Sequence, residues 1–500
     1  MDWSAGLPLA LLLASLLPAA IIFLLPEERD LARRVINMAG AVLKVALAGV
    51  LIVGVFTGHE YEWRSAFLPG VDLVLRVDPI PLLFVTLSSL LWLTTTIYAV
   101  GYLAGQPHQA RFFGFFSLCV SATIGIALAG NLVTFLLFYE LLTVTTYPLV
   151  VQRGDERSLA GGRAYLLYTV TGGAILLVGI AWLHSLAGSV EFLEHGALTG
   201  IALAHRTELT VIFVLLVGGL GFKTALVPLH GWLPQAMVAP APVSALLHAV
   251  AVVKAGAYGI VRVVYDLYGL PLAVDLGVLT PLAVAAAVTI VYGSLRALTQ
   301  DDLKRRLAYS TVSQLSYIVL GVATVGLTGA TGGLAHLVHQ GIQKVTLFYC
   351  AGNLTKALGV TKVSEMRGVG RKLPLTMAAF TVAALGMIGI PPTAGFFTKW
   401  YLGLGGLESG QGWVLAVLVA SSLLNAAYFL PVIARAWFRA PEGAATHAPE
   451  RAGLLEVSWW LLLPPVATGA SVLVLGVFAG VPLSPLSWAG FIAQEVLGRP

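Results

Sequence analysis

The chain has 500 residues, of which 58% are hydrophobic and only 11% are charged. Soluble domains carry roughly 25% charged residues, so this composition excludes a soluble protein and predicts an integral membrane protein. The net charge of +5 does not indicate nucleic-acid binding, because the basic residues follow the pattern of membrane topology.

Apolar segments of about 20 residues recur along the chain, and each is long enough to cross about 30 Å of hydrocarbon. We therefore predict an all-α polytopic membrane protein with about fourteen transmembrane helices. These cover residues 6–25, 34–57, 77–100, 112–129, 131–150, 162–187, 209–229, 242–265, 276–296, 307–326, 331–356, 374–394, 411–434 and 457–479.

The basic residues test this number of helices. With fourteen helices, the loops on one face hold 19 Lys and Arg, and the other face, termini included, holds five. This asymmetry predicts a cell-membrane protein with both termini outside. Residues 6–25 also invite interpretation as a signal peptide, but basic residues follow this segment rather than precede it, so we retain it as a helix.

Buried charge is concentrated at a few positions. Glu140 is the only carboxylate near the middle of a predicted helix, and Lys223, Lys254 and Lys344 lie near the centres of three others. A charge at membrane depth costs several kcal/mol unless it is paired, hydrated or neutralised, so such residues mark ion or proton routes. A structural ion pair that fixes helix packing is the alternative. We favour proton exchange between Glu140 and Lys223.

Glycine and proline interrupt two predicted helices beside a lysine, at Gly221 and Pro228 in one and at Pro391 and Pro392 in the other. Lys399 follows the second interruption, as Lys223 adjoins the first. Proline removes a helical hydrogen bond and glycine loosens the turn, so both helices should break there.

Broken helices at corresponding places point to two inverted five-helix repeats. We therefore divide the chain into residues 1–110 (the first three helices), 111–268 (helices four to eight, the first repeat), 269–435 (helices nine to thirteen, the second repeat) and 436–500 (a cytoplasmic linker, the last helix and a C-terminal tail). The end of the chain, from residue 485 on, is too short and polar to span a membrane.

The predicted helix 331–356 adds polar groups. His336, Gln340 and Lys344 are spaced four residues apart and line one face, and His339 flanks that face. Histidine titrates near neutral pH, which suits a proton relay. A single histidine in a helix is more often a satisfied core residue, but two histidines within two turns of a central lysine favour a hydrated route.

Five motifs in matching order resemble the proton-translocating antiporter module shared by Mrp-type cation/proton antiporters, respiratory complex I and membrane-bound hydrogenases. They are FYELLTVTTYPLV, GFKTALVPLHGWLPQAMVAPAPVSALLHAVAVVKAG, DDLKRRLAYSTVSQLSYIVLG, HLVHQGIQKVTLFYCAG and GIPPTAGFFTKW. Within that family the chain most resembles the MrpD type of antiporter component.

The resemblance implies a role for each of the polar residues in a proton pathway. Glu140 and Lys223 match the family's glutamate and lysine of helices five and seven, Lys254 its connecting lysine, and Lys399 its terminal lysine. The remaining matches are His248, His336 and Lys344. Gln340 and Gln314 depart from the family, because histidine often stands at the first position and stands at the second in a related member.

The resemblance leaves three functions open. The first is the proton-translocating subunit of a multi-subunit Na⁺/H⁺ antiporter, which would assemble with related antiporter-like subunits and membrane lipids. The second is the equivalent subunit of a redox complex, an NADH-quinone oxidoreductase or membrane-bound hydrogenase. The third is a scaffold that transports nothing. In each case we expect a subunit that is not itself an enzyme.

No glycine-rich nucleotide loop, CxxC pair or haem motif occurs, so we expect no cofactor and no metal in this chain. Lys44 lies near the middle of the second predicted helix, outside the matching motifs, and we expect it to face a neighbouring subunit.

Overall fold

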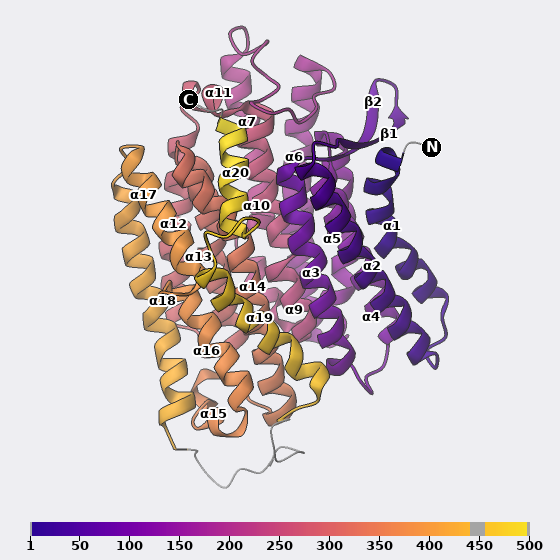
Figure 1. Ribbon diagram of the computed structural model, residues 1–500, viewed down its shortest axis with the longest axis vertical. Coiled ribbons are helices and arrows are strands. Elements are labelled where there is room, and N and C mark those ends of the chain that lie inside the picture. The colour runs from indigo at the N-terminus through magenta and orange to yellow at the C-terminus, as the bar shows by residue number, and fades with distance from the viewer. Residues whose placement is uncertain (1–2, 441–455, 498–500) are drawn as a thin grey trace.

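The computed structural model describes residues 3–440 and 456–497, and α-helices dominate both ranges (Figure 1). The first part of the chain forms α1 (Trp3–Leu24), α2 (Asp30–Phe56), the antiparallel strands β1 (Tyr61–Leu68) and β2 (Val71–Val77), and α3 (Pro79–Tyr102). The two-stranded hairpin was not predicted; residues 58–76 were expected to form a loop.

The next part holds the first interrupted helix. It comprises α4 (Gln109–Leu128), α5 (Leu132–Val150), α6 (Glu156–Ala187), α7 (Arg206–Thr224), α8 (Trp232–Gln235), the 3₁₀ helix η1 (Ala236–Val238), α9 (Ala241–Ala249), α10 (Val252–Arg262), the π-helix η2 (Val263–Tyr268) and α11 (Leu270–Asp275).

The last part holds the second interrupted helix. It comprises α12 (Leu279–Leu298), α13 (Leu303–Ala323), α14 (Leu327–Leu358), η3 (Val363–Glu365), α15 (Val369–Lys372), α16 (Pro374–Ile388), α17 (Ala394–Glu408), α18 (Trp413–Phe438), α19 (Trp459–Val477) and α20 (Pro485–Leu497). Part of the predicted linker, residues 441–455, lies outside the described residues, as does Arg499.

The number of membrane crossings agrees with the prediction. Within the described ranges, eleven helical segments are long and apolar enough to cross a membrane. The other three predicted crossings are α13, α14 and the pair α16 and α17, which are long enough but are polar or interrupted. The division of the bundle into two repeats stays a prediction.

Both predicted breaks are present. In α7 the helix ends at Thr224, and Ala225 adopts a left-handed conformation with φ of 62°. Between α16 and α17 the helix ends at Gly389, with φ of 90°. Pro228 and Pro392 each follow a cis peptide bond within these breaks.

A third break was missed. The predicted continuous helix 242–265 is divided into α9 and α10, because Val250 and Ala251 leave the helical conformation. Neither residue is glycine or proline, so the local sequence carries no signal for this break. It lies between His248 and Lys254 and therefore separates two residues of the predicted pathway.

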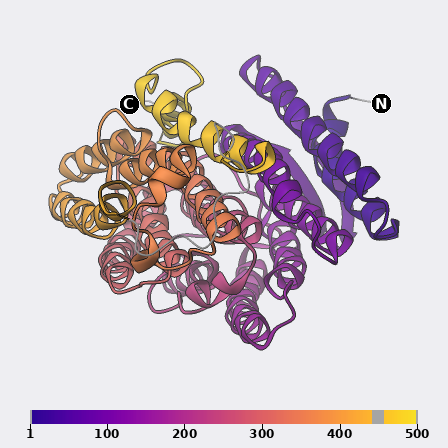
Figure 2. The same ribbon diagram turned by 90° about the horizontal axis from the view of Figure 1, so that it is seen from below.

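Helix α14 occupies the centre of the bundle. It contacts α3, α9, α13, α16, α17, α19 and α20, and Figure 2 shows α1 and α2 at one edge of the bundle with the orange helices at the opposite edge. Small residues permit this close packing: a Cβ placed on Gly321 of α13 would lie 2.6 Å from Cα of Gly333 of α14.

Candidate proton pathway

Lys223 lies one residue before the break in α7 and is completely buried. Its Nζ donates a hydrogen bond to the backbone carbonyl of Tyr139 on α5 and lies 3.3 Å from the centre of the Tyr139 ring. The carbonyl and the ring face stabilise the ammonium, and neither carries a full negative charge. The contact joins α7 to α5 where Glu140 follows in sequence.

Glu140 does not form the direct ion pair with Lys223 that we predicted. No ion pair links the two residues within the described chain, and the ammonium contacts the carbonyl of the preceding residue instead. Glu140 is half-buried against α6, where a Cβ on Gly173 would clash with Oε1 of Glu140. The absence of a side chain at Gly173 provides the space for the carboxyl group.

Lys254 on α10 is completely buried, and its Nζ donates a 2.5 Å hydrogen bond to the carbonyl of Leu337 on α14. Two residues further on, a Cβ on Gly256 would lie 2.5 Å from Oγ1 of Thr224, so α10 meets α7 beside Lys223. Lys254 thus lies between the first broken helix and α14.

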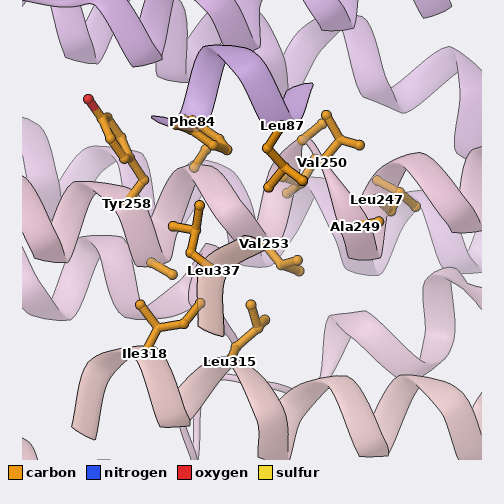
Figure 3. Close-up of a cluster of buried hydrophobic side chains, with 14 of the residues drawn as sticks. Phe84, Leu87, Leu247, Ala249, Val250, Val253, Tyr258, Leu315, Ile318 and Leu337 are labelled. Carbon is orange, nitrogen blue, oxygen red and sulfur yellow. The ribbon is translucent and has the colours of Figure 1, made fainter. Parts of the chain in front are cut away.

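Apolar side chains surround the junction of α10, α13 and α14. Figure 3 shows them converging from these helices and from α3 and α9; they include Val250, Val253, Leu315, Ile318, Leu337, Phe84 and Leu87. Such a cluster excludes bulk water, so the charge on Lys254 interacts more strongly with its polar neighbours than it would in water.

A continuous line of polar groups joins Lys344 to Lys399. Nζ of Lys344 lies 2.7 Å from Oγ of Ser310, and the hydroxyl of Tyr428 contacts both Ser310 (2.8 Å) and Oδ1 of Asn425. Nδ2 of Asn425 donates to the carbonyl of Met387 (3.2 Å). Nζ of Lys399 donates to the same carbonyl (2.9 Å).

Sequence reasoning missed Tyr428 and Asn425, which lie on α18. Single tyrosine and asparagine residues in an apolar helix are common, and only their spacing of three residues placed them on one face. Lys399 also bonds to the carbonyl of Ile388 (2.8 Å) and to Oγ of Ser422 (3.0 Å), at the break before α17.

The two histidines of α14 lie at different distances from this line. The ring of His336 stacks on Tyr317, with centroids 5.1 Å apart, and its Nδ1 lies 3.1 Å from Oγ1 of Thr398 on α17. His339 is buried on the neighbouring face, next to Gln340. Thr398 directly precedes Lys399, so His336 reaches the second broken helix.

Three buried glutamines have amide groups that no described residue hydrogen-bonds. They are Gln314, Gln340 and Gln343. Buried amides are normally satisfied by protein or by ordered water, so this region fits a hydrated route. The glutamines that replace the family's histidines therefore supply polar surface without a titratable proton.

His248 connects the pathway with a cavity at the predicted cytoplasmic face. Its Nε2 lies 3.2 Å from Sδ of Met237, and its ring stacks on Phe348 at 4.6 Å, one turn from Lys344. Met237 lines a cavity of about 690 Å³ together with Lys304, Arg153 and other residues of the basic loops. The pathway thus approaches the surface through His248.

A second cavity, of about 600 Å³, opens at the opposite face between the hairpin and α20. Asp266 lines it, and its Oδ2 lies 2.9 Å from Nε of the buried Arg262. Arg262 also bonds to Asp78 at 3.1 Å. Sequence reasoning placed Arg262 and Asp266 at a helix end, although their spacing of four residues indicated a pair.

The chain is similar to known components of membrane complexes along its whole length. Residues 129–425 match the family described as NADH:quinone oxidoreductase/Mrp antiporter, transmembrane part. The N component of the NADH-quinone oxidoreductase of Desulforudis audaxviator is 36% identical over 490 residues, which cover 95% of this chain and 96% of that protein. The D component of the Na⁺/H⁺ antiporter of Alkalihalophilus pseudofirmus is 26% identical, over 96% of this chain and 97% of that one.

The fold has a close counterpart among solved structures. A chain of the Mrp complex from Dietzia sp. superposes with a TM-score of 0.87 at 25% sequence identity, and the match covers 100% of both chains. The arrangement of helices described above is therefore that of a membrane-complex subunit.

Proposed function

Because this chain belongs to the NADH:quinone oxidoreductase/Mrp antiporter membrane-subunit family, we propose that it translocates protons as one subunit of a multi-subunit Na⁺/H⁺ antiporter of the Mrp type. The supporting observation is the lysine row, defined as Lys223, Lys254, Lys344 and Lys399. Each of these lysines donates to a backbone carbonyl of another helix, and none forms an ion pair with a described carboxylate.

Neutral partners leave each ammonium free to lose its proton. A carboxylate contact would hold the charge on the lysine, whereas a carbonyl stabilises it only partly in an apolar setting. Protonation of one lysine repels the proton on the next. At 4 Å and an effective dielectric of 20, that coupling is about 4 kcal/mol, and it falls as the separation grows. A change at Glu140 and Lys223 is thereby passed along the row to Lys399.

Protons enter and leave this row through the two cavities in our proposal. The cavity beside Met237 and Lys304 adjoins His248, and the cavity beside Asp266 adjoins the end of α10, two turns beyond Lys254. The first faces the cytoplasm and the second the outside if the chain has both termini outside the cell membrane, as the basic residues predict.

A second candidate is the equivalent subunit of a redox-driven proton pump. It is supported by the 36% identity to the N component of an NADH-quinone oxidoreductase over nearly the whole chain. Both candidates use the same row of lysines, and they differ in the source of energy. The difference therefore lies in the subunits that surround this chain.

The test is to purify the intact complex from its native membrane, identify the copurifying subunits, and reconstitute it in proteoliposomes. We expect a Na⁺ gradient to drive proton movement, with no iron–sulfur subunit present. Quinone or hydrogen activity with redox subunits would instead establish the second candidate.

Lys223→Ala provides the test of proton transport itself. The assembled variant should lose proton movement, because the first member of the row is absent. Normal transport by assembled Glu140→Ala and Lys254→Ala variants would establish a scaffold role instead.

A further inference from the structure

Lys44 on α2 belongs to none of the helices that carry the lysine row. We expected it to face a neighbouring subunit, and this was wrong: the side chain is completely buried within the chain. It points toward α1, α3 and α4. No ion pair links it to a carboxylate within the described residues.

Neutral polar groups surround the Lys44 ammonium. Nζ lies 2.5 Å from Oγ of Ser15 on α1, and Ser15 lies 2.7 Å from Oγ of Ser121 on α4. Ser121 donates to the carbonyl of Ser117 at 3.1 Å. The ammonium also lies 4.8 Å from the centre of the Trp92 ring on α3, a cation–π contact.

The polar groups continue toward the end of α2 that begins at Asp30. Oγ of Ser117 donates to Oδ1 of Asn37 at 2.9 Å. One turn earlier, the buried Arg33 bonds to Asp30 at 3.3 Å. Fourteen residues separate Asp30 from Lys44, which corresponds to about 21 Å of helix. Lys44 thus lies near mid-membrane, and polar side chains connect its level to one face.

Several buried polar atoms in this region have no hydrogen-bond partner among the described residues. On α3, Oγ of Ser88, Nε1 of Trp92 and Oγ1 of Thr96 follow at intervals of four residues and so share one face. On α2, Nδ2 of Asn37 is likewise unpartnered. All four side chains are completely buried. Buried groups of this kind are normally satisfied by water, so their alignment fits a narrow hydrated path.

We propose that Lys44 is a proton-binding residue of a second polar site, built by α1 to α4, that exchanges protons with the membrane face carrying the α1–α2 loop. The site goes beyond the proposed lysine row, because α3 separates Lys44 from α14. Its ligand is a proton delivered by water.

The transfer balances through the two hydroxyl groups. The Lys44 ammonium gives a proton to Oγ of Ser15, and Ser15 gives its own hydroxyl proton to Ser121. Ser121 then gives its own proton to a water molecule. Lysine ends as the neutral amine, both serines are unchanged, and the charge leaves as hydronium; the reverse sequence reloads Lys44.

Two substitutions of Lys44 distinguish proton exchange from a structural charge. Arginine keeps a permanent positive charge over Trp92, whereas methionine removes it. In proteoliposomes of the complete complex, we expect Lys44→Arg and Lys44→Met both to lower proton flux by at least about tenfold. Lys356→Met is the matched control: Lys356 also bonds to two carbonyls, those of Gly101 and Tyr102, and its loss should leave flux unchanged. Full flux in Lys44→Arg would overturn the proposal.

A labelling experiment tests the site even if these variants fail to assemble or if the complex moves no protons. In a chain whose native Cys119 and Cys350 are replaced by alanine, Ser121→Cys should react with a small water-soluble thiosulfonate at least about tenfold faster than Ile124→Cys. Both positions are buried on α4, but only Ser121 lies on the polar line. Equal rates would show that no water reaches the site and would exclude the proposed exchange.

Discussion

Backbone carbonyls are the common partners of the buried lysines. Lys254 illustrates the consequence, since its single contact with the carbonyl of Leu337 only partly offsets the cost of removing an ammonium from water. Such a residue opposes folding while it serves transport. Stability and function should therefore respond in opposite directions to its removal.

We predict that Lys254→Met raises the free energy of unfolding by about 1 to 3 kcal/mol, because it removes a desolvated charge and keeps the apolar volume. The same variant should lose proton transport. Thermal unfolding in detergent and proton flux in vesicles measure the two effects. A variant that transports normally would show that Lys254 is not part of the pathway.

The positions of these lysines were predictable and their partners were not. A lysine in an apolar segment is evident in the sequence, because the cost of burial makes it rare. Its partner here is a carbonyl that every residue possesses, so no sequence pattern identifies Tyr139 or Leu337. For the same reason, the ion pair expected between Glu140 and Lys223 was wrong as a direct contact.

At the level of elements, the breaks bring side chains to the ends of half-helices. Gly389 ends α16 with φ of 90°, and a Cβ there would lie 2.8 Å from Cδ of Lys399. Gly359 ends α14 with φ of 68° and has open space around it. The two glycines therefore share a backbone requirement but differ in their neighbours.

Substitution of each glycine by alanine separates these effects. Both variants should lose about 1 kcal/mol of stability from left-handed backbone strain. Gly389→Ala should also displace Lys399 and lower proton flux severalfold, whereas Gly359→Ala should transport normally. Equal flux in the two variants would mean that the position of Lys399 beside the break is unimportant.

The hairpin is the element most dependent on charge. Arg64 and Arg76 bond to Glu191 at 2.6 and 2.5 Å and thereby join β1 and β2 to the segment before α7. Burial alone would raise the pKa of Glu191, but hydrogen bonds from the two arginines outweigh it and hold the pKa below its ordinary value of 4.5.

A carboxyl group whose pKa is depressed by folding stabilises the fold above its unfolded pKa and loses that contribution as pH falls. We therefore predict that Glu191→Gln lowers the free energy of unfolding by about 1 kcal/mol at neutral pH. The difference from the unsubstituted chain should shrink as pH falls below 4.5. Thermal unfolding across this range checks it, and a difference that persists at acid pH would contradict the assignment to the ion pairs.

The predictability of elements follows the same physics. Glycine and proline mark the two predicted breaks, because both change the backbone directly. The break at Val250 and Ala251 depends on how α9 and α10 pack against the rest of the bundle, and the local sequence does not encode it.

At the scale of the whole molecule, the two cavities lie at opposite faces and the lysine row lies between them. Lys304 lines the cavity on the basic side, and Asp266 lines the cavity near the hairpin. An even number of crossings places both termini on one side of the membrane. The direction of proton movement then depends on which side that is.

We predict that the hairpin side faces outward, because the basic residues concentrate on the other face. Leu203, before α7, and Thr299, after α12, are exposed residues on opposite faces. In intact cells, a membrane-impermeant thiol reagent should label Leu203→Cys at once and Thr299→Cys only after permeabilisation. The native Cys119 and Cys350 are buried and should give little background. Labelling of Thr299→Cys alone in intact cells would invert the topology, and with it the assignment of the cavity beside His248 to the cytoplasm.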